Sequence, residues 1–135
     1  MANALYDKGR EAFLTGGINW LADSIKAVLV DTGAYTVNLA THQFLSDIAA
    51  GARVATSANL SAKTVAAGVA DAADSLFTAV SGPSVEAVVL YKDTGTAGTS
   101  ALIAYIDTAS GLPVTPNGGD ITVTWDNGAN KIFKL

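Results

Sequence analysis

The sequence lacks cysteine altogether and contains a single histidine, His42. Disulfide scaffolds, thiolate metal sites, cysteine nucleophiles and histidine-based triads within one chain are therefore excluded. Charged residues are also scarce, at 15%, and the 8 Lys+Arg against 12 Asp+Glu give a net charge of −4. Without a basic field to attract phosphates, we expect no nucleic-acid partner.

Long apolar runs are missing too. Apolar runs such as those at 27–30 and 87–91 are far shorter than the roughly 20 residues that a bilayer-spanning helix needs, so we expect no membrane partner. The opening residues 1–8 carry acidic and polar side chains where an export signal would have a basic start and an apolar run. We therefore expect synthesis and folding in a cytosol.

What is present favours one compact domain. The chain has 135 residues, half of them hydrophobic, and a mean hydropathy of +0.34. This size leaves little room for a second core, and the composition is that of a folding chain rather than a disordered tail.

The first residues favour a helix. Asn3 is a possible N-cap, residues 3–14 are compatible with a helix, and Gly16 and Gly17 would end it. Gly9 in the middle costs about 1 kcal/mol relative to alanine, which predicts a helix that is short or held by docking. We expect residues 1–20 to form an N-terminal arm or short helix that docks outside its own core.

The rest of the chain consists of short β-type segments separated by Gly, Asp, Asn and Pro. Residues 25–31 and 85–92 are rich in apolar residues at both odd and even positions, which is typical of strands covered on both faces. Residues 121–125 alternate apolar and threonine side chains, which predicts a strand with one buried face. The other candidate strands are 53–60, 63–69, 75–80, 101–107, 120–125 and 131–135. The spacing predicts an all-β fold, an antiparallel β-sandwich of jelly-roll or immunoglobulin-like type, with residues 21–135 as its single domain.

Three connections are informative. The Asn-Gly pair within residues 126–130 is typical of a tight turn, so we expect a closing hairpin between 120–125 and 131–135. Residues 94–100 are small and flexible, and residues 110–119 form a longer loop with two prolines. We expect both loops to be surface features.

Residues that could perform chemistry are few. His42 has no readable partner and is best interpreted as a hydrogen-bonded structural residue or a surface residue. Asp71, Asp74 and the oxygen-rich residues 126–130 invite a calcium hypothesis, but they fit no complete ligand set and are the residues that turns require. Glu11 and Glu86 lie in unlike contexts and make no acid/base pair. We therefore predict no catalytic, metal or cofactor-binding residue and no enzymatic activity.

Aromatic residues allow two interpretations. Their side chains could stack on sugars, or they could fill the core or an oligomer interface, and the second is the commoner use in a small β domain. The residues concerned are Trp20, Tyr35, Tyr91, Tyr105 and Trp125.

Several stretches carry a family resemblance that covers nearly the full chain. They are ANALYDKGRE at 2–11, the strand at 25–31, HQFLSDI at 42–48 with GARV at 51–54, VLYKDTGTAGTS at 89–100, and PVTPNGGD at 113–120 with WDNG at 125–128. Together they resemble a small virion structural protein of tailed bacteriophages.

The resemblance implies a capsid decoration, or cement, protein. Such a protein would be made in the bacterial host cytoplasm, form a homotrimer and bind the major capsid protein on the outer capsid surface of the virion. The alternative is a tail-associated receptor- or carbohydrate-binding module whose loops at 94–100 and 112–119 meet a host-surface glycan.

Overall fold

A five-stranded antiparallel sheet forms the middle of the protein in the computed structural model, which describes residues 4–125, 128 and 131–135. The strand order is β1-β8-β7-β2-β3. These strands are β1 (Ala4–Leu5), β2 (Ile25–Val30), β3 (Arg53–Thr56), β7 (Ala87–Lys92) and β8 (Leu102–Ile106).

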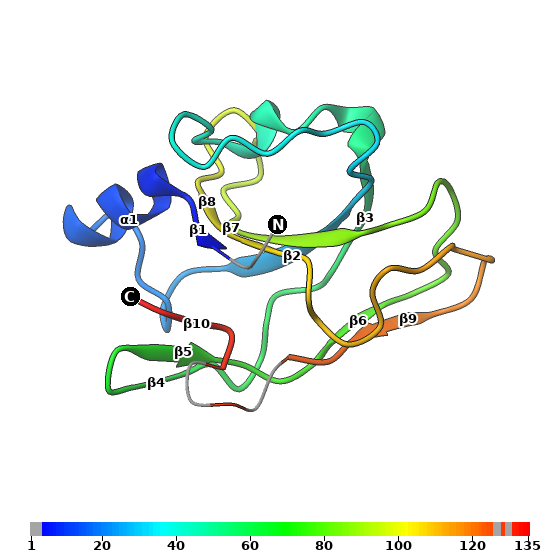
Figure 1. Ribbon diagram of the computed structural model, residues 1–135. Helices are drawn as coiled ribbons and strands as arrows, with labels where there is room; N and C mark the ends of the chain where they lie inside the picture. Colours follow the sequence, from blue (N-terminus) through cyan, green and yellow to red (C-terminus); the bar gives the residue numbers. More distant parts are fainter. Residues whose placement is uncertain (1–3, 126–127, 129–130) are drawn as a thin grey trace.

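Two smaller antiparallel sheets lie below it in the view of Figure 1. One has the order β10-β5-β4 and the other pairs β6 with β9. The strands are β4 (Thr64–Ala66), β5 (Val69–Asp71), β6 (Ser75–Phe77), β9 (Ile121–Val123) and β10 (Phe133–Lys134). The expected all-β class is confirmed at this level. No helix in the described part of the chain is long and apolar enough to span a membrane.

Within the described residues, helical structure is limited to three short elements. The helix α1 (Asp7–Leu14) packs on β8, while η1 (Leu45–Asp47) and η2 (Ala50–Ala52) are single 3-10 turns. Both turns lie in the segment that covers the upper face of the central sheet in Figure 1.

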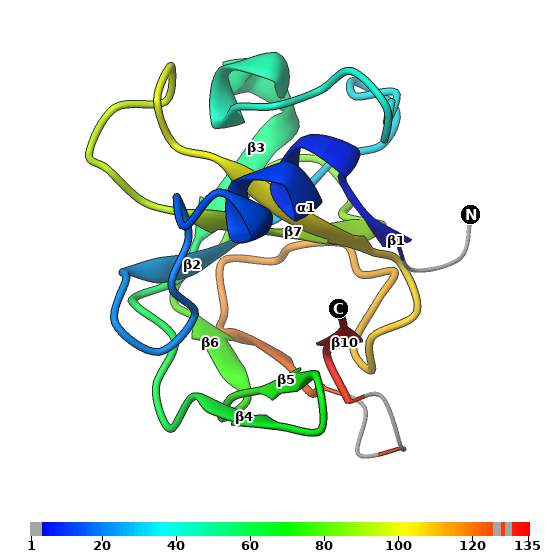
Figure 2. The ribbon, with the colours of Figure 1, turned by 90° about the vertical axis from the view of Figure 1, so that its left-hand side faces the viewer.

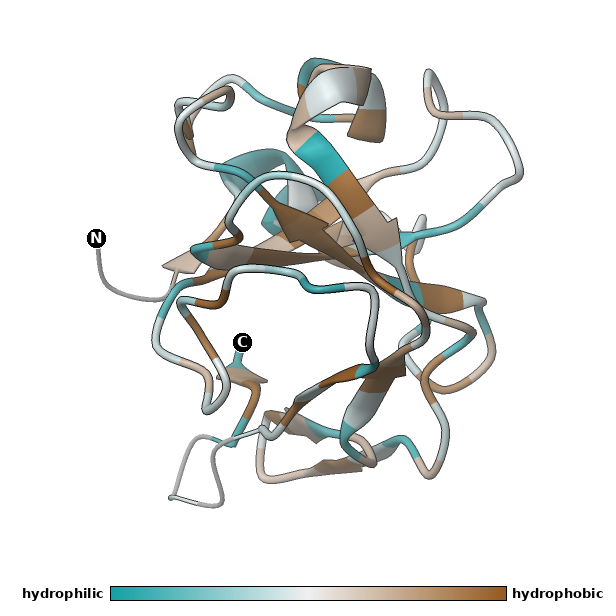
Figure 3. Cartoon of the chain, turned by 90° about the vertical axis from the view of Figure 1, so that its right-hand side faces the viewer, coloured by the Kyte–Doolittle hydropathy of each residue, from teal (hydrophilic) through white to brown (hydrophobic). Residues whose placement is uncertain are grey.

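The central sheet is covered on both faces. In β2, Ala27 and Leu29 join the core beneath the sheet, whereas Val28 and Val30 join the core above it. All four side chains have no exposed surface, and the central strands are the most hydrophobic band in Figure 3. The prediction that 25–31 and 85–92 contain doubly covered strands is confirmed, because alternate side chains of a strand leave on opposite faces.

The predicted amphipathic strand is also present. Ile121, Val123 and Trp125 are buried, while Thr122 between them is exposed. The alternation follows the two-residue period of a strand that covers one face of the core.

The N-terminal segment lies within the fold. Ala4 and Leu5 pair with Tyr105 and Ala104 at the edge of the central sheet, and Leu5 and Tyr6 are buried. The expectation that this segment docks outside its own core is wrong for residues 4–20, because its apolar side chains complete that core. The helix begins at Asp7 after Tyr6 as its N-cap, and the proposed cap Asn3 lies outside the described residues.

The candidate strand at 63–69 is divided by a turn. Ala67 and Gly68 both have positive φ, at 51° and 78°, and they connect the paired residues Ala66 and Val69. Two consecutive positive φ values in a two-residue loop are typical of a type I′ hairpin turn. One predicted strand is therefore the two strands β4 and β5.

The expected closing hairpin is wrong. The last strand, β10, pairs with β5 through Phe133 opposite Ala70, and β9 pairs with β6. Of the turn at 126–130, only residue 128 is described. Pairing with β5 brings the Phe133 ring against Trp20, with 5.2 Å between ring centroids, and this contact is unavailable to a simple hairpin with β9.

Candidate functional site

An apolar groove of about 370 Å³ opens where α1, the β4–β5 hairpin and β10 meet. Its floor consists of buried or partly buried side chains, and its rim of exposed ones. The floor contains the buried Ile18, Trp20, Ala70 and Phe133 and the partly buried Phe13, and the rim contains Leu21, Val65 and Leu135. In Figure 2, α1 lies above β10 and the β4–β5 hairpin on the side of the molecule that faces the viewer. We call this feature the apolar groove.

Aromatic contacts hold the floor together. The Trp20 ring meets Phe133 edge-on, and Phe13 lies 6.0 Å from Phe133 between ring centroids. The Trp20 indole N–H donates a hydrogen bond to the Asp71 carbonyl at 3.3 Å. Because its one polar atom is satisfied, the indole presents only apolar surface to the groove.

The rim is unusual because large apolar side chains are exposed there. Leu21, Val65 and Leu135 are each more than half exposed, and Leu14 at the end of α1, next to Phe13, is 84% exposed. Leu21, Val65 and Leu135 come from segments far apart in the sequence and line one groove. A contiguous exposed apolar patch of this kind is typical of a protein–protein contact.

Hydrogen bonds fix the loop at 17–23 that forms one wall. The Asn19 side-chain oxygen accepts the N–H groups of Leu21 and Ala22, and the Asn19 N–H donates to the Asp23 carboxylate at 2.7 Å. The Lys92 ammonium donates to the Gly17 carbonyl at 2.8 Å and pairs with Asp23 at 3.3 Å. This wall is therefore held in place before any ligand arrives.

Two carboxylates beside this wall have lowered pKa values, which predicts that the folded state loses stability in acid. The Asn19 N–H and Lys92 hold the pKa of Asp23 below its ordinary value of 3.8, and the Lys26 ammonium and the Gly95 N–H lower the pKa of Asp93 in the same way. A lowered folded-state pKa gives stability that is present above the unfolded value and lost as the pH falls through the folded one.

We therefore expect the free energy of unfolding, measured by urea denaturation, to fall between about pH 5 and about pH 2. The variant Asp93→Asn should lose less stability over this range than the unmodified protein, because it has no carboxylate to protonate at that position. An identical pH dependence in the two proteins would contradict this assignment.

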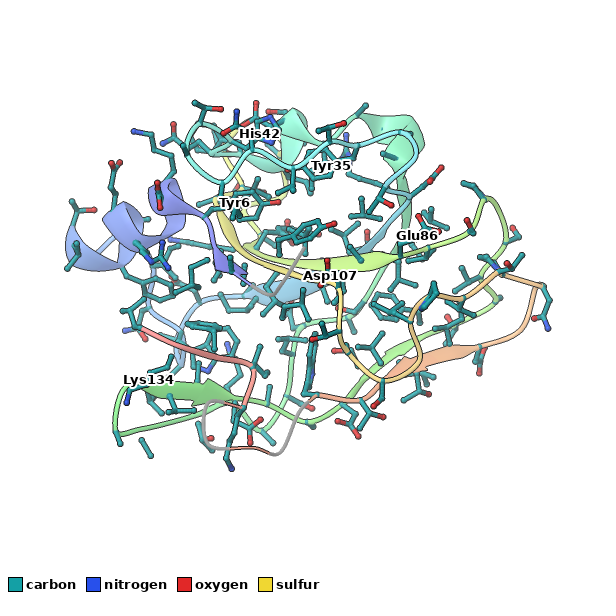
Figure 4. All side chains as sticks on the ribbon, viewed as in Figure 1. Tyr6, Tyr35, His42, Glu86, Asp107 and Lys134 are labelled. Atoms are coloured by element: carbon teal, nitrogen blue, oxygen red, sulfur yellow. The ribbon has the colours of Figure 1, made fainter. Side chains whose placement is uncertain are left out.

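His42 belongs to a different part of the molecule. Its Nδ1 atom accepts the Asn38 N–H and lies 2.7 Å from the Tyr35 hydroxyl, which lies 2.9 Å from the Tyr6 hydroxyl. Because Nδ1 acts as the acceptor, Tyr35 donates to His42 and Tyr6 donates to Tyr35. Burial raises the pKa of both tyrosines. Figure 4 shows this chain of side chains joining the upper segment to the start of α1, which is a structural role.

The candidate carboxylates are held separately. Asp71 pairs with Lys131 at 3.4 Å, and Asp74 accepts the Trp125 N–H at 3.1 Å. Burial raises the pKa of Glu86, but hydrogen bonds from Ser84 and Thr32 outweigh it and the net change is downward. Glu11 is paired with Lys8 on α1. Among the described residues, no three His, Asp or Glu side chains are close enough together to hold a metal ion.

The aromatic residues that could stack on sugars are buried. Trp20, Tyr35, Tyr91, Tyr105 and Trp125 are all at most 5% exposed, so none offers a ring face to solvent. In the 94–100 loop, the Thr94 hydroxyl lies 2.6 Å from that of Thr99, and the Ser100 hydroxyl donates to the Thr96 carbonyl. Internal bonds of this kind order the loop.

Sequence reasoning did not find the apolar groove. Its rim residues are 21, 65 and 135, and no local pattern links them. No protein-family model matches this sequence, and none of the curated proteins matches it.

Proposed function

We propose that this chain is a virion structural protein of a tailed bacteriophage, a capsid decoration protein that binds the outer capsid surface as a homotrimer. The observation that carries the proposal is the apolar groove with its exposed rim, a surface suited to assembly. The sequence resemblance supplies the virion context. In this proposal the central sheet and the smaller sheets beneath it act as the two layers of a β-sandwich.

A small rigid module can stabilise a shell through several weak contacts. A trimer that touches three capsid subunits makes the second and third contacts at a high effective concentration once the first has formed. No single contact then has to be large. The tightly covered central sheet suits this role, because a module that bridges subunits must transmit force without deforming.

The test is to locate the chain in intact particles. Cryo-electron microscopy of purified virions should place it on the outer capsid surface, and its copy number per particle should be a multiple of three. Purified protein added to capsids that lack it should bind and raise the temperature at which they disrupt. Absence from virions, or a position inside the shell, would contradict the proposal.

One observation favours the alternative of a carbohydrate-binding tail module. A crevice of about 340 Å³ lies between residues 56–61 and 73–78, and serine, threonine and asparagine side chains line it together with Asp74, two alanines, Leu60 and Leu76. The Ser75 hydroxyl on its wall is buried and has no hydrogen-bond partner in the described part of the chain. Binding to a glycan array together with a tail position in virions would favour this alternative over the capsid role.

A further inference from the structure

Exposed large hydrophobic side chains are few on the described surface. Three of them, Leu21, Val65 and Leu135, line the rim of the apolar groove, and a fourth, Leu14, follows the groove residue Phe13 in α1. The fifth, Leu76, lies on β6 and is 51% exposed. Figure 1 shows β6 and β9 at the opposite end of the lower layer from β4, β5 and β10. The lower layer therefore carries the apolar groove at one end and the exposed Leu76 at the other.

The β6–β9 ribbon fixes the direction of Leu76. Its neighbours Ser75 and Phe77 are buried, so the alternation of the strand turns Leu76 outward. Its cross-strand partner Thr122 is exposed on the same face. Leu76 is thus an apolar side chain on a regular strand, with its backbone already hydrogen-bonded, and its burial would need no refolding.

Charges at the two ends are complementary. Lys134 lies against Gly68, which lines the groove, and its ammonium has no ion-pair partner within the described ranges. Near Leu76, Asp74 and Asp120 accept backbone N–H groups at 3.1 Å and 3.0 Å, and neither meets a cation in the part of the chain that the structure describes. Juxtaposed, the two ends would bring a lysine toward two carboxylates.

We propose that copies of this chain associate head to tail, with Leu76 of one copy seated in the apolar groove of the next. The inference rests on the proposed homotrimer and names the two surfaces that build it. Because the two surfaces differ, the contact is heterologous. An open chain of copies has one unoccupied apolar groove and one exposed Leu76 at its ends, whereas a closed ring has neither. In the proposed homotrimer each groove holds the Leu76 of a neighbouring copy, so no groove and no Leu76 is left free.

Two single substitutions test the two surfaces independently. Leu76→Asp removes the projecting side chain and keeps the groove, whereas Val65→Asp places a charge on the groove rim and keeps Leu76. Both positions are exposed, so both variants should fold, which circular dichroism checks. Thr41→Asp, at an exposed position in the upper segment, is the matched control and should leave assembly unchanged.

The readout is mass in solution by analytical ultracentrifugation. The unmodified protein should be a trimer, and each variant alone should be a monomer, with association weakened at least roughly 30-fold, as for an interface hot spot. Mixed in equal amounts, the two variants should form a dimer of one copy each, since Leu76 of the Val65→Asp chain still fits the groove of the Leu76→Asp chain. A two-fold symmetric interface is distinguished by the unmodified protein, which would then be a dimer rather than a trimer.

A monomeric unmodified protein, a trimer that survives Leu76→Asp, or a mixture that stays monomeric would each overturn the inference. Failure of the capsid role has a different signature. Head-to-tail trimers in solution together with virions that lack the chain would leave this inference standing and refute the proposed function. Single copies bound to the capsid with Leu76 exposed would support the proposed function and refute the head-to-tail inference.

Discussion

Replacing Gly9 by alanine is expected to destabilise the protein by about 1–3 kcal/mol, the usual effect of forcing an extra group into a packed interior. A glycine-to-alanine change inside a helix normally stabilises it by up to about 1 kcal/mol. Here the added Cβ would lie 2.6 Å from the Leu102 carbonyl oxygen and 3.1 Å from the Ile103 Cα. Both atoms belong to the backbone of β8, which cannot yield without disturbing the central sheet.

Urea denaturation followed by circular dichroism measures this effect. Gly98→Ala is the matched control, because a Cβ at Gly98 meets no atom within 4 Å and the residue does not have a positive φ. The control should leave stability unchanged or raise it slightly, since alanine restricts the unfolded chain. Equal or opposite effects of the two substitutions would mean that α1 does not pack closely on β8.

The second large effect is expected for Phe133→Ala, which should cost about 3–5 kcal/mol, as large-to-small aromatic substitutions in a core do. The Phe133 ring contacts both Trp20 and Phe13 and is only 9% exposed. Its loss removes the centre of the groove floor and exposes one face of Trp20 to water.

Thermal unfolding and tryptophan fluorescence together measure this change. A lower midpoint should accompany a red-shifted emission in the folded state, because Trp20 gains contact with solvent. Lys134→Ala, on the same strand but with an exposed side chain, should alter neither quantity appreciably. A Phe133→Ala protein with unchanged stability would show that β10 does not close the fold against β5.

The Gly9 position illustrates how local reasoning can misjudge a segment. From sequence, a glycine in the middle of a helix indicates weakness, and the segment was expected to dock outside its own core. In the structure Gly9 is buried in α1, where its lack of a side chain permits close packing on β8. The same residue that lowers helix propensity is the reason the helix can belong to the core.

The sequence by itself determined those strands in which the pattern of apolar and polar residues shows which faces are buried. The apolar runs at 25–31 and 85–92 and the alternation at 121–125 follow from the two-residue period of a strand, and the scarcity of charge required a large core. Only the tertiary structure decided that β10 pairs with β5, that residues 4–20 complete the core, and that residues 21, 65 and 135 line one groove. Alternation is a property of neighbouring residues. Strand pairing and the apolar groove depend instead on contacts between segments far apart in the chain. Short strands of similar composition do not indicate which of these segments pair.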